Sequence, residues 1–284
     1  MTRTATAWVA AAVAVCLLAG VWGWRDWHAE DARGVLVAGG DGGGLPRAAP
    51  SLEGFDEAAL QLTAANALAQ GASAVLVTRH GHLVLEQYGH GADAGTLIGG
   101  GELDYPLLIA AAGVAAAQYG MSLPAPPLDA DRLAADITAA AGKSYPEFLS
   151  RHVWQPLNAG PARWLSPGLH ARATDWLRVA ELLMHDGRFE GRQIVARGWV
   201  AGHMSQISGP AIQAPMVGGM IRLRGAGATR LWLVPSLDLA VLRVSAAPAP
   251  GAPVDEALAR TISNEVRDRP ASGGSSLRDV VPGH

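Results

Sequence analysis

Three histidines in the first third of the chain could act as metal ligands. His80 and His82 flank Gly81, and His90 follows soon after them. A zinc site needs several nitrogen, sulfur or oxygen ligands that converge on one point. His80 and His82 span a predicted turn, so their side chains need not converge, and no further ligands stand at a convincing spacing. Exposed hairpin histidines are the better interpretation, and the sequence predicts no metal site and no cofactor.

Serine nucleophiles and phosphate loops are poorly supported. Ser205 and Ser208 follow His203, and a serine–histidine pair can act as nucleophile and general base. Neither serine stands in the Gly-x-Ser-x-Gly turn that presents such a nucleophile, so loop polarity explains both better. Glycine pairs occur at 218–219 and at 225 and 227. No predicted helix follows them to hold phosphate at its N-terminus, which argues against a nucleotide site.

Composition removes further classes of function. The chain has 284 residues, a formal net charge of -3 and a single cysteine, Cys16. Cys16 lies in the apolar N-terminal stretch, so the rest of the chain has no disulfide, thiolate metal site or cysteine nucleophile. The nearly balanced charge provides no basic field for nucleic acid, and no nucleic-acid partner is expected.

The N-terminus has the features of a membrane anchor. Residues 4–24 contain no charged side chain, and a helix of this length, at about 1.5 Å per residue, would cross a hydrocarbon core of about 30 Å. Arg3 precedes the stretch, which favours a cytoplasmic N-terminus. We therefore expect residues 1–27 to anchor the protein in the cytoplasmic membrane, with the rest extracytoplasmic, or periplasmic in a Gram-negative cell. The alternative is a cleaved signal and a secreted protein, although Trp22-Gly23-Trp24 is a poor cleavage site.

The remaining chain divides into three parts. Residues 28–52 are rich in Gly, Ala, Pro and Asp, and predict a flexible linker. Residues 269–284 predict a disordered tail. The folded domain is expected at 53–268.

The hydrophobic pattern of the domain predicts helices that segregate from antiparallel strands, an α+β architecture. The predicted helices are 56–70, 106–118, 131–153 with an interruption near Gly142, 175–186 and 254–267. The predicted strands form two hairpins, 73–79 with 82–88 and 230–235 with 239–244.

Several segments, taken in order, resemble the serine β-lactamase, esterase and penicillin-binding family of the class C type. The matching segments are Arg79-His80-Gly81-His82, Thr96-Leu97, the stretches 142–158, 168–178 and 185–195, Gly198-Trp199-Val200, and the Val-Pro-x-x-Asp-Leu hairpin at 234–239. The resemblance covers about residues 53–267. It implies an antiparallel sheet flanked by N- and C-terminal helices, with a reduced helical subdomain, but a shared fold does not imply activity.

The family's nucleophile motif is missing. Activity in the family depends on Ser-x-x-Lys at a helix start, where one helical turn places the lysine against the serine. Counting from Thr96 places Glu102 at the serine position and Tyr105 at the lysine position. The only lysine is Lys143, and the residue three positions before it is Ala140, so no Ser-x-x-Lys exists in this chain.

The two other family motifs are also absent. No tyrosine or serine is followed two residues later by asparagine, and the segment that would carry this motif is shortened between 124 and 132. The nearest counterpart of Lys-Thr-Gly is the run from Arg224 to Gly227. Arg224 could provide positive charge for a carboxylate, but a guanidinium is a poor proton shuttle because it stays protonated.

Glu102, Asp104, Tyr105 and Arg224 are the candidates for a residual cleft. Glu102 could act as a carboxylate nucleophile or base, with Tyr105 one turn away and Asp104 nearby. The simpler explanation is that acidic residues at a helix N-terminus are favoured by the helix dipole. The preceding glycines at 99–101 suggest a loosened turn rather than a tightly held site.

Three hypotheses follow. The first is a catalytically degenerate homologue that binds a small-molecule, peptidoglycan-like or protein ligand. The second is an active hydrolase of an ester, amide or peptide, with a site rebuilt around Glu102, Tyr105 and Arg224. The third is a decaying gene product with no selected function.

Overall fold

A computed structural model describes residues 34–124, 128–165, 168–203, 213–216, 219–245 and 252–267. The predicted membrane anchor and the whole of the predicted tail lie outside these ranges, so both stay predictions. Within these ranges, no helix is long and apolar enough to cross a membrane.

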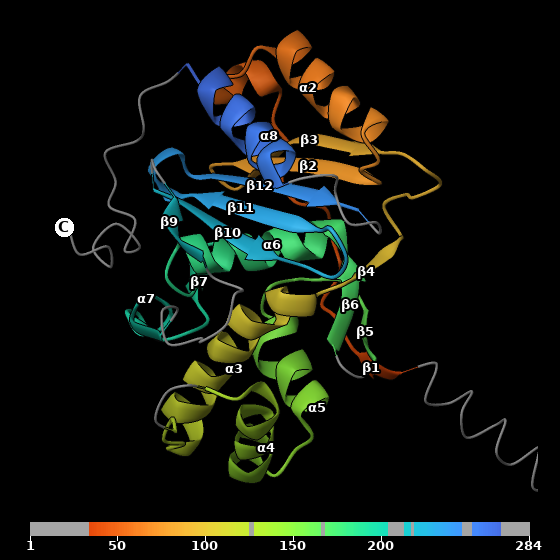
Figure 1. The fold of residues 1–284 in the computed structure, drawn as a ribbon. Coiled ribbons are helices and arrows are strands. Elements are labelled where there is room, and N and C mark those ends of the chain that lie inside the picture. Colours follow the sequence, from red (N-terminus) through yellow and green to blue (C-terminus); the bar gives the residue numbers. More distant parts are fainter. Residues whose placement is uncertain are drawn as a thin grey trace, which may run out of the picture.

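A six-stranded antiparallel sheet forms the centre of the fold (Figure 1). Its strands, in spatial order, are β3 (His82–Tyr88), β2 (Ala74–Arg79), β12 (Leu239–Val244), β11 (Arg230–Val234), β10 (Met220–Arg224) and β9 (Gln213–Met216). Both predicted hairpins are present. β2 and β12 are buried along their whole length, as expected for neighbouring strands covered on both faces.

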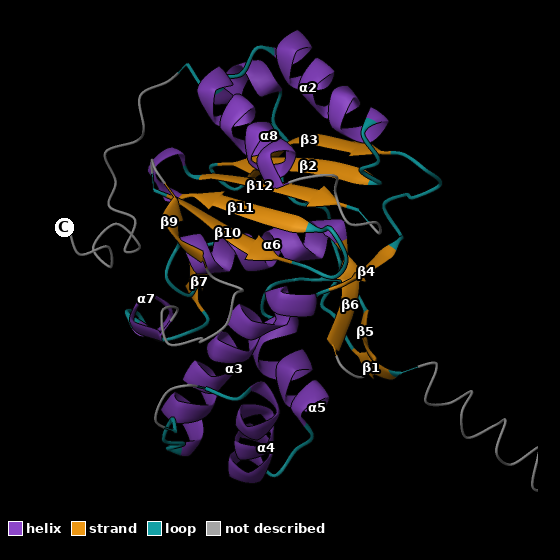
Figure 2. Cartoon of the chain, in the orientation of Figure 1, coloured by secondary structure: helices purple, strands orange, loops and turns teal. Residues whose placement is uncertain are grey.

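Helices cover the two faces of this sheet (Figure 2). α2 (Glu57–Ala69) and α8 (Ala252–Glu265) pack on one face, and α6 (Ala173–Met184) packs on the other. Side chains alternate between the faces of a strand, so Val75 and Val77 lie under α2 and α8 while Leu76 joins the core on the α6 side. Asp56 caps α2 as predicted, accepting a hydrogen bond of 3.1 Å from the backbone N–H of Ala59.

A helical layer lies on the side of the sheet that α6 covers, at the bottom of the view in Figure 1. It contains α3 (Asp104–Tyr119), α4 (Ala130–Ala141), α5 (Tyr145–Leu149) and a π-helical turn, η3 (Ser150–Trp154). The predicted interruption is real: Gly142 ends α4 in the left-handed conformation with φ of 65°. α3 is buried along most of its apolar length, and its first turn faces the end of β10.

A second, smaller sheet was not predicted. It orders β1 (Val35–Val37), β5 (Ala162–Leu165), β6 (Gly168–Arg172) and β4 (Leu97–Gly99). β1 lies in the predicted linker, and Val37 and Leu45 from the same stretch are buried in the core. The linker interpretation is therefore wrong for this part, because two apolar contacts and strand pairing outweigh its loop-like composition.

A buried ion cluster fixes α6 against this smaller sheet. Asp175 is fully buried and accepts hydrogen bonds from Arg172 Nε at 2.8 Å and Arg178 Nη1 at 2.9 Å. Its carboxylate also accepts the backbone N–H of Gly160 at 3.0 Å. The remaining short elements are η1 (Pro50–Glu53), η2 (Gly101–Leu103), β7 (Arg188–Phe189), β8 (Arg192–Gln193), α7 (Trp199–His203) and η5 (Pro235–Leu237).

Candidate functional site

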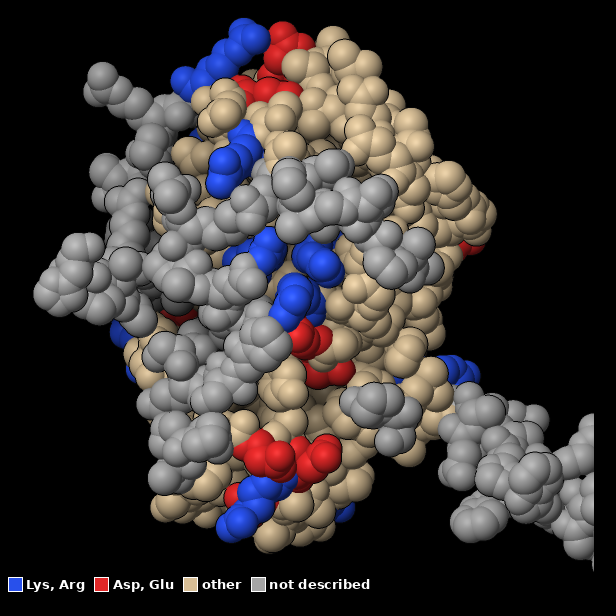
Figure 3. Space-filling model, viewed as in Figure 1, with Lys and Arg blue, Asp and Glu red and all other residues tan. Residues whose placement is uncertain are grey.

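A cleft of about 580 Å³ lies where β10 and β11 meet the helical layer. Arginine side chains over the sheet face Asp and Glu side chains over the helices on this side of the molecule (Figure 3). Arg224 and Arg230 line the sheet side of the cleft, and Asp129 and Asp131 line it from the start of α4. The cleft therefore offers both signs of charge within one small volume.

The structure brings the four candidate residues together in this cleft. Glu102 comes from η2, Asp104 and Tyr105 come from the first turn of α3, and Arg224 ends β10. Tyr105 and Arg224 are far apart in the sequence, and the packing of η2 against β10 brings them together. These residues thus share one site, at the place where the resemblance locates the nucleophile.

Glu102 is held by an arginine. Arg224 Nε donates to Glu102 Oε2 at 3.0 Å, and each side chain is about 30% exposed. The guanidinium neutralises the carboxylate and occupies one of its oxygens. This pairing makes Oε2 of Glu102 less available as a nucleophile, since that oxygen is engaged by a permanent cation.

Asp104 has a different environment. Burial raises the pKa of its carboxyl to about 7, against a lowering effect of the hydrogen bond from the Leu169 backbone N–H. That N–H lies 3.3 Å from Oδ2 and 3.4 Å from Oδ1. Near neutral pH this carboxyl exists in both protonation states, so it is the cleft group with acid–base capacity.

Tyr145 and Trp164, which are not among the residues predicted for the site, form an aromatic wall of the cleft. Their rings meet edge to face, with centroids 5.2 Å apart and an interplanar angle of 76°. Burial, and next the charge of Asp104, raise the pKa of the Tyr145 phenol well above its usual range. Tyr145 belongs to the 142–158 stretch, whose resemblance to the family indicates the fold but does not point to a site residue.

The glycine turn before α3 is tightly packed, and the expectation of a loosened turn is wrong. A Cβ on Gly100 would lie 2.2 Å from Asp104 Oδ1 and 2.6 Å from Trp176. Gly101 has φ of 55°, and a Cβ there would lie 2.6 Å from the backbone N of Ala226. Gly101 is needed because η2 is pressed against the β10–β11 turn, and Gly100 because Asp104 and Trp176 occupy the space of a side chain.

No serine, threonine, cysteine or lysine is found among the described residues that line the cleft. Lys143 lies instead on the helical layer, where its Nζ pairs with Glu147 Oε1 at 3.3 Å and the side chain is 51% exposed. The hydroxyl groups in the cleft are the phenols of Tyr105 and Tyr145. The described part of the cleft thus lacks an aliphatic hydroxyl with an adjacent amine base.

The other sequence candidates lie elsewhere. The Nδ1 atoms of His80 and His82 both approach Glu53, at 2.7 and 2.8 Å, so these two side chains do converge, but on a carboxylate. His90 is separate, with its Nε2 2.9 Å from the carbonyl oxygen of Leu68. Ser205 and Ser208 lie outside the described residues.

No protein-family model matches the chain, and no curated protein matches it in sequence. Its fold matches a Bacillus anthracis protein described as a candidate 6-aminohexanoate-dimer hydrolase, with a TM-score of 0.61, 15% identity and coverage of 82% of this chain and 90% of that one. It also matches EstCE1, a hydrolase with promiscuous acyltransferase activity, with a TM-score of 0.54, 14% identity and coverage of 74% and 98%. A β-lactamase from Mycobacterium bovis gives a TM-score of 0.53, 15% identity and coverage of 72% and 99%.

These matches define the class of fold. The chain has the α+β fold of the β-lactamase and penicillin-binding-protein-like serine hydrolases, and the predicted fold class is confirmed. At such low identity the likeness concerns the fold alone, so the chemistry must be argued from the cleft.

Proposed function

We propose that this protein is a membrane-tethered, extracytoplasmic domain that uses the cleft of a β-lactamase-like hydrolase fold to bind a ligand, without forming an acyl-enzyme. The observation that carries the proposal is the composition of the cleft. The cleft keeps charged and aromatic groups, but Glu102 and Tyr105 stand where the family resemblance requires serine and lysine. Acyl transfer needs nucleophile and base together, and neither is present at these positions.

The charges of the cleft suggest the class of ligand. On one side Arg230 suits a carboxylate, since its strand neighbour Arg224 is already paired with Glu102. Asp129 and Asp131 on the other side suit an ammonium group. Tyr145 and Trp164 add an aromatic surface to the same cleft. A small zwitterion or short peptide, including a peptidoglycan-like peptide, matches this arrangement better than an apolar molecule does.

The tether rests on the N-terminal sequence. Residues 4–24 are uncharged and long enough to cross a bilayer, and their charge flanks favour an outward-facing domain. Extraction of membranes with alkaline carbonate tests this part: the chain should remain in the pellet at its full mass. Release of the full-length protein by carbonate would contradict the tether, and a soluble, shortened chain would indicate signal cleavage instead.

Binding is tested by calorimetry on the full-length chain in mild detergent, with D-alanyl-D-alanine as the peptide probe. Arg230→Gln should weaken binding by roughly tenfold, the effect expected for loss of a charge-assisted hydrogen bond. Arg151→Gln is the matched control, because Arg151 is an exposed arginine on η3, paired with Glu147 at 3.9 Å and absent from the cleft lining. Equal binding by wild type and Arg230→Gln would contradict the cleft as the binding site.

The second candidate function is hydrolysis of an ester, amide or peptide by a rebuilt site around Glu102, Tyr105 and Arg224. The pKa of about 7 for Asp104 favours it, since a cleft carboxyl in this range can transfer protons at neutral pH. Under the binding proposal, Glu102→Gln leaves hydrolysis of p-nitrophenyl acetate at the level of the wild-type background. If the wild type hydrolyses the ester much faster than the uncatalysed reaction in solution and Glu102→Gln abolishes this activity, the hydrolase hypothesis is correct.

A further inference from the structure

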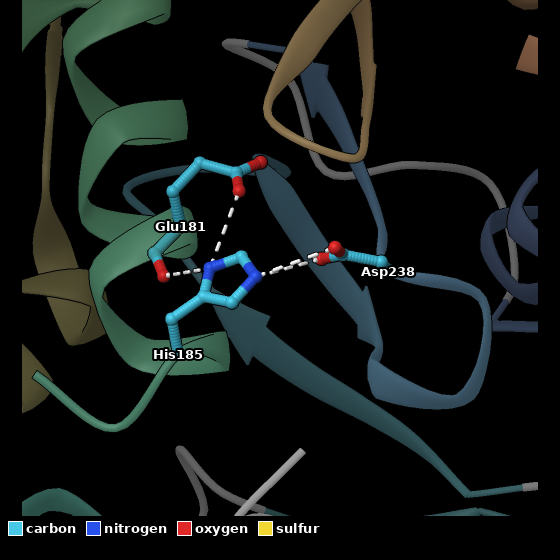
Figure 4. A group of neighbouring side chains, drawn as sticks. All are labelled: Glu181, His185 and Asp238. Carbon is cyan, nitrogen blue, oxygen red and sulfur yellow. Dashed lines mark hydrogen bonds and ion pairs between the residues drawn. The ribbon is translucent and has the colours of Figure 1, made fainter. Parts of the chain in front are cut away.

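A second pocket, of about 360 Å³, lies apart from the cleft and shares no lining residue with it. It is formed by the β2–β3 turn, the last turn of α6, the β7–β8 turn and the turn between β11 and β12. Glu181, His185 and Asp238 meet in this pocket (Figure 4). The proposed ligand-binding function makes no use of it.

The geometry of His185 leaves a position for a cation. Its Nδ1 lies 2.9 Å from the carbonyl oxygen of Glu181, so this nitrogen carries a hydrogen and donates it. The other nitrogen, Nε2, faces Asp238, at 3.2 Å from Oδ1 and 3.3 Å from Oδ2. In neutral imidazole Nε2 is then an acceptor, and it faces a second acceptor. Either a proton or a metal ion must lie between them.

Glu181 adds a second carboxylate to the same cluster. Its side chain is only 4% exposed, and its Oε1 accepts a hydrogen bond of 2.8 Å from Thr78 Oγ1. The other oxygen, Oε2, lies 3.6 Å from His185 Nδ1, beyond hydrogen-bond distance. One ligand atom from each of the three residues lies within 4.8 Å of the others. A buried carboxylate beside a second one is costly unless a cation compensates it.

The fold holds the three side chains in place. Glu181 lies in the last turn of α6 and His185 caps its C-terminal end four residues later, the spacing that brings helical side chains together. Asp238 sits in the left-handed conformation, with φ of 48°, at the end of η5, and its carboxylate points back to the helix (Figure 4). A hydrogen bond from the free ring nitrogen to a backbone carbonyl is also the usual support of a metal-binding histidine.

We propose that Glu181, His185 and Asp238 form a binding site for a divalent transition-metal ion, with Zn²⁺ the best match and solvent completing the coordination. One imidazole and two carboxylates are a donor set that zinc accepts, and a site with three protein ligands leaves a position open. The side chains of His185 and Asp238 are 40% and 29% exposed, so the ion can enter from the pocket. The inference is independent of the cleft and of its ligand.

The test is calorimetric titration of the full-length chain, stripped with a chelator, with ZnCl₂. The wild type should bind one zinc ion per chain at this site, and His185→Gln and Asp238→Asn should each weaken that binding by about 100-fold or more. His90→Gln is the matched control, because His90 belongs to another hairpin end and hydrogen-bonds to Leu68. Thermal unfolding without metal confirms that each variant is folded.

Two variants and a spectrum keep the inference falsifiable. If one of the two variants fails to fold, the zinc affinity of the other tests the proposal. In addition, Co²⁺ bound to the wild type should give the visible absorption of a low-coordinate site, and Asp238→Asn should abolish this absorption. Absence of zinc binding by the folded wild type would overturn the proposal, and a proton would then lie between His185 Nε2 and the Asp238 carboxylate. Equal zinc affinity in wild type and His185→Gln would overturn it as well.

Discussion

Asp104 sits in the first turn of α3, and burial raises the pKa of its carboxyl to about 7. In the unfolded chain the same group ionises near pH 3.9. The folded state therefore holds an extra proton between these values. The contribution of Asp104 to stability is greatest below about pH 4, falls as pH rises, and reaches its lowest value above about pH 7.

Replacing Asp104 by asparagine removes this dependence. Asp104→Asn should stabilise the protein by about 1 to 3 kcal/mol at pH 8, where the buried charge is most costly, and by little near pH 4. Urea unfolding of both proteins at the two pH values measures the difference. A variant less stable than wild type at pH 8 would show that the carboxylate is compensated.

Some of the site residues could be predicted from the sequence and others could not. Glu102, Asp104 and Tyr105 are neighbours in the chain, and the family resemblance supplied Arg224, so their meeting in one cleft was predictable. Tyr145 was missed because only the fold brings it to the first turn of α3. The Glu181, His185 and Asp238 cluster was missed because Asp238 lies 53 residues from His185, and no local pattern joins them.

The turn from β4 through η2 into α3 determines how rigid the cleft is. Gly99 accepts a hydrogen bond of 3.4 Å from the Ala226 backbone N–H, and Gly100 donates one of 2.7 Å to Leu169. Gly100 has an ordinary helical φ of -65°, so its lack of a side chain serves packing rather than backbone conformation.

Gly100→Ala is therefore expected to destabilise the fold through steric contact alone. The added Cβ would press on Asp104 and Trp176, at a cost of about 1 to 3 kcal/mol in the free energy of unfolding. Gly44→Ala is the control, because nothing lies within 4 Å of its Cβ position. Chemical denaturation compares the two, and an equal effect of both substitutions would argue that the turn is not tightly packed.

Long elements were predictable, and short ones were not. The two hairpins and α2, α3, α6 and α8 carry apolar patterns several residues long, and all of them are present. The strands of the smaller sheet contain only three to five residues each, and their pairing joins distant segments. Too few residues repeat there for a pattern to appear, so the composition of the β1 segment predicts a linker.

At the scale of the whole molecule, the fold of a serine hydrolase surrounds a cleft without the serine and lysine that the resemblance requires. The tightly packed glycine turn and the aromatic pair of Tyr145 and Trp164 are part of the structure around this cleft. A supporting structure that is retained around a cleft whose described lining holds no serine or lysine is what the binding proposal expects. A decaying gene product would instead give a chain without a cooperative unfolding transition.

The most direct test asks whether any residue of this chain can be acylated. The full-length protein is incubated separately with a fluorescent penicillin and a fluorophosphonate, with an active serine β-lactamase treated in parallel, and covalent adducts are read by intact mass. The proposal predicts no adduct on protein that unfolds cooperatively. A stoichiometric adduct, located by peptide mapping, would contradict it by showing an activated nucleophile.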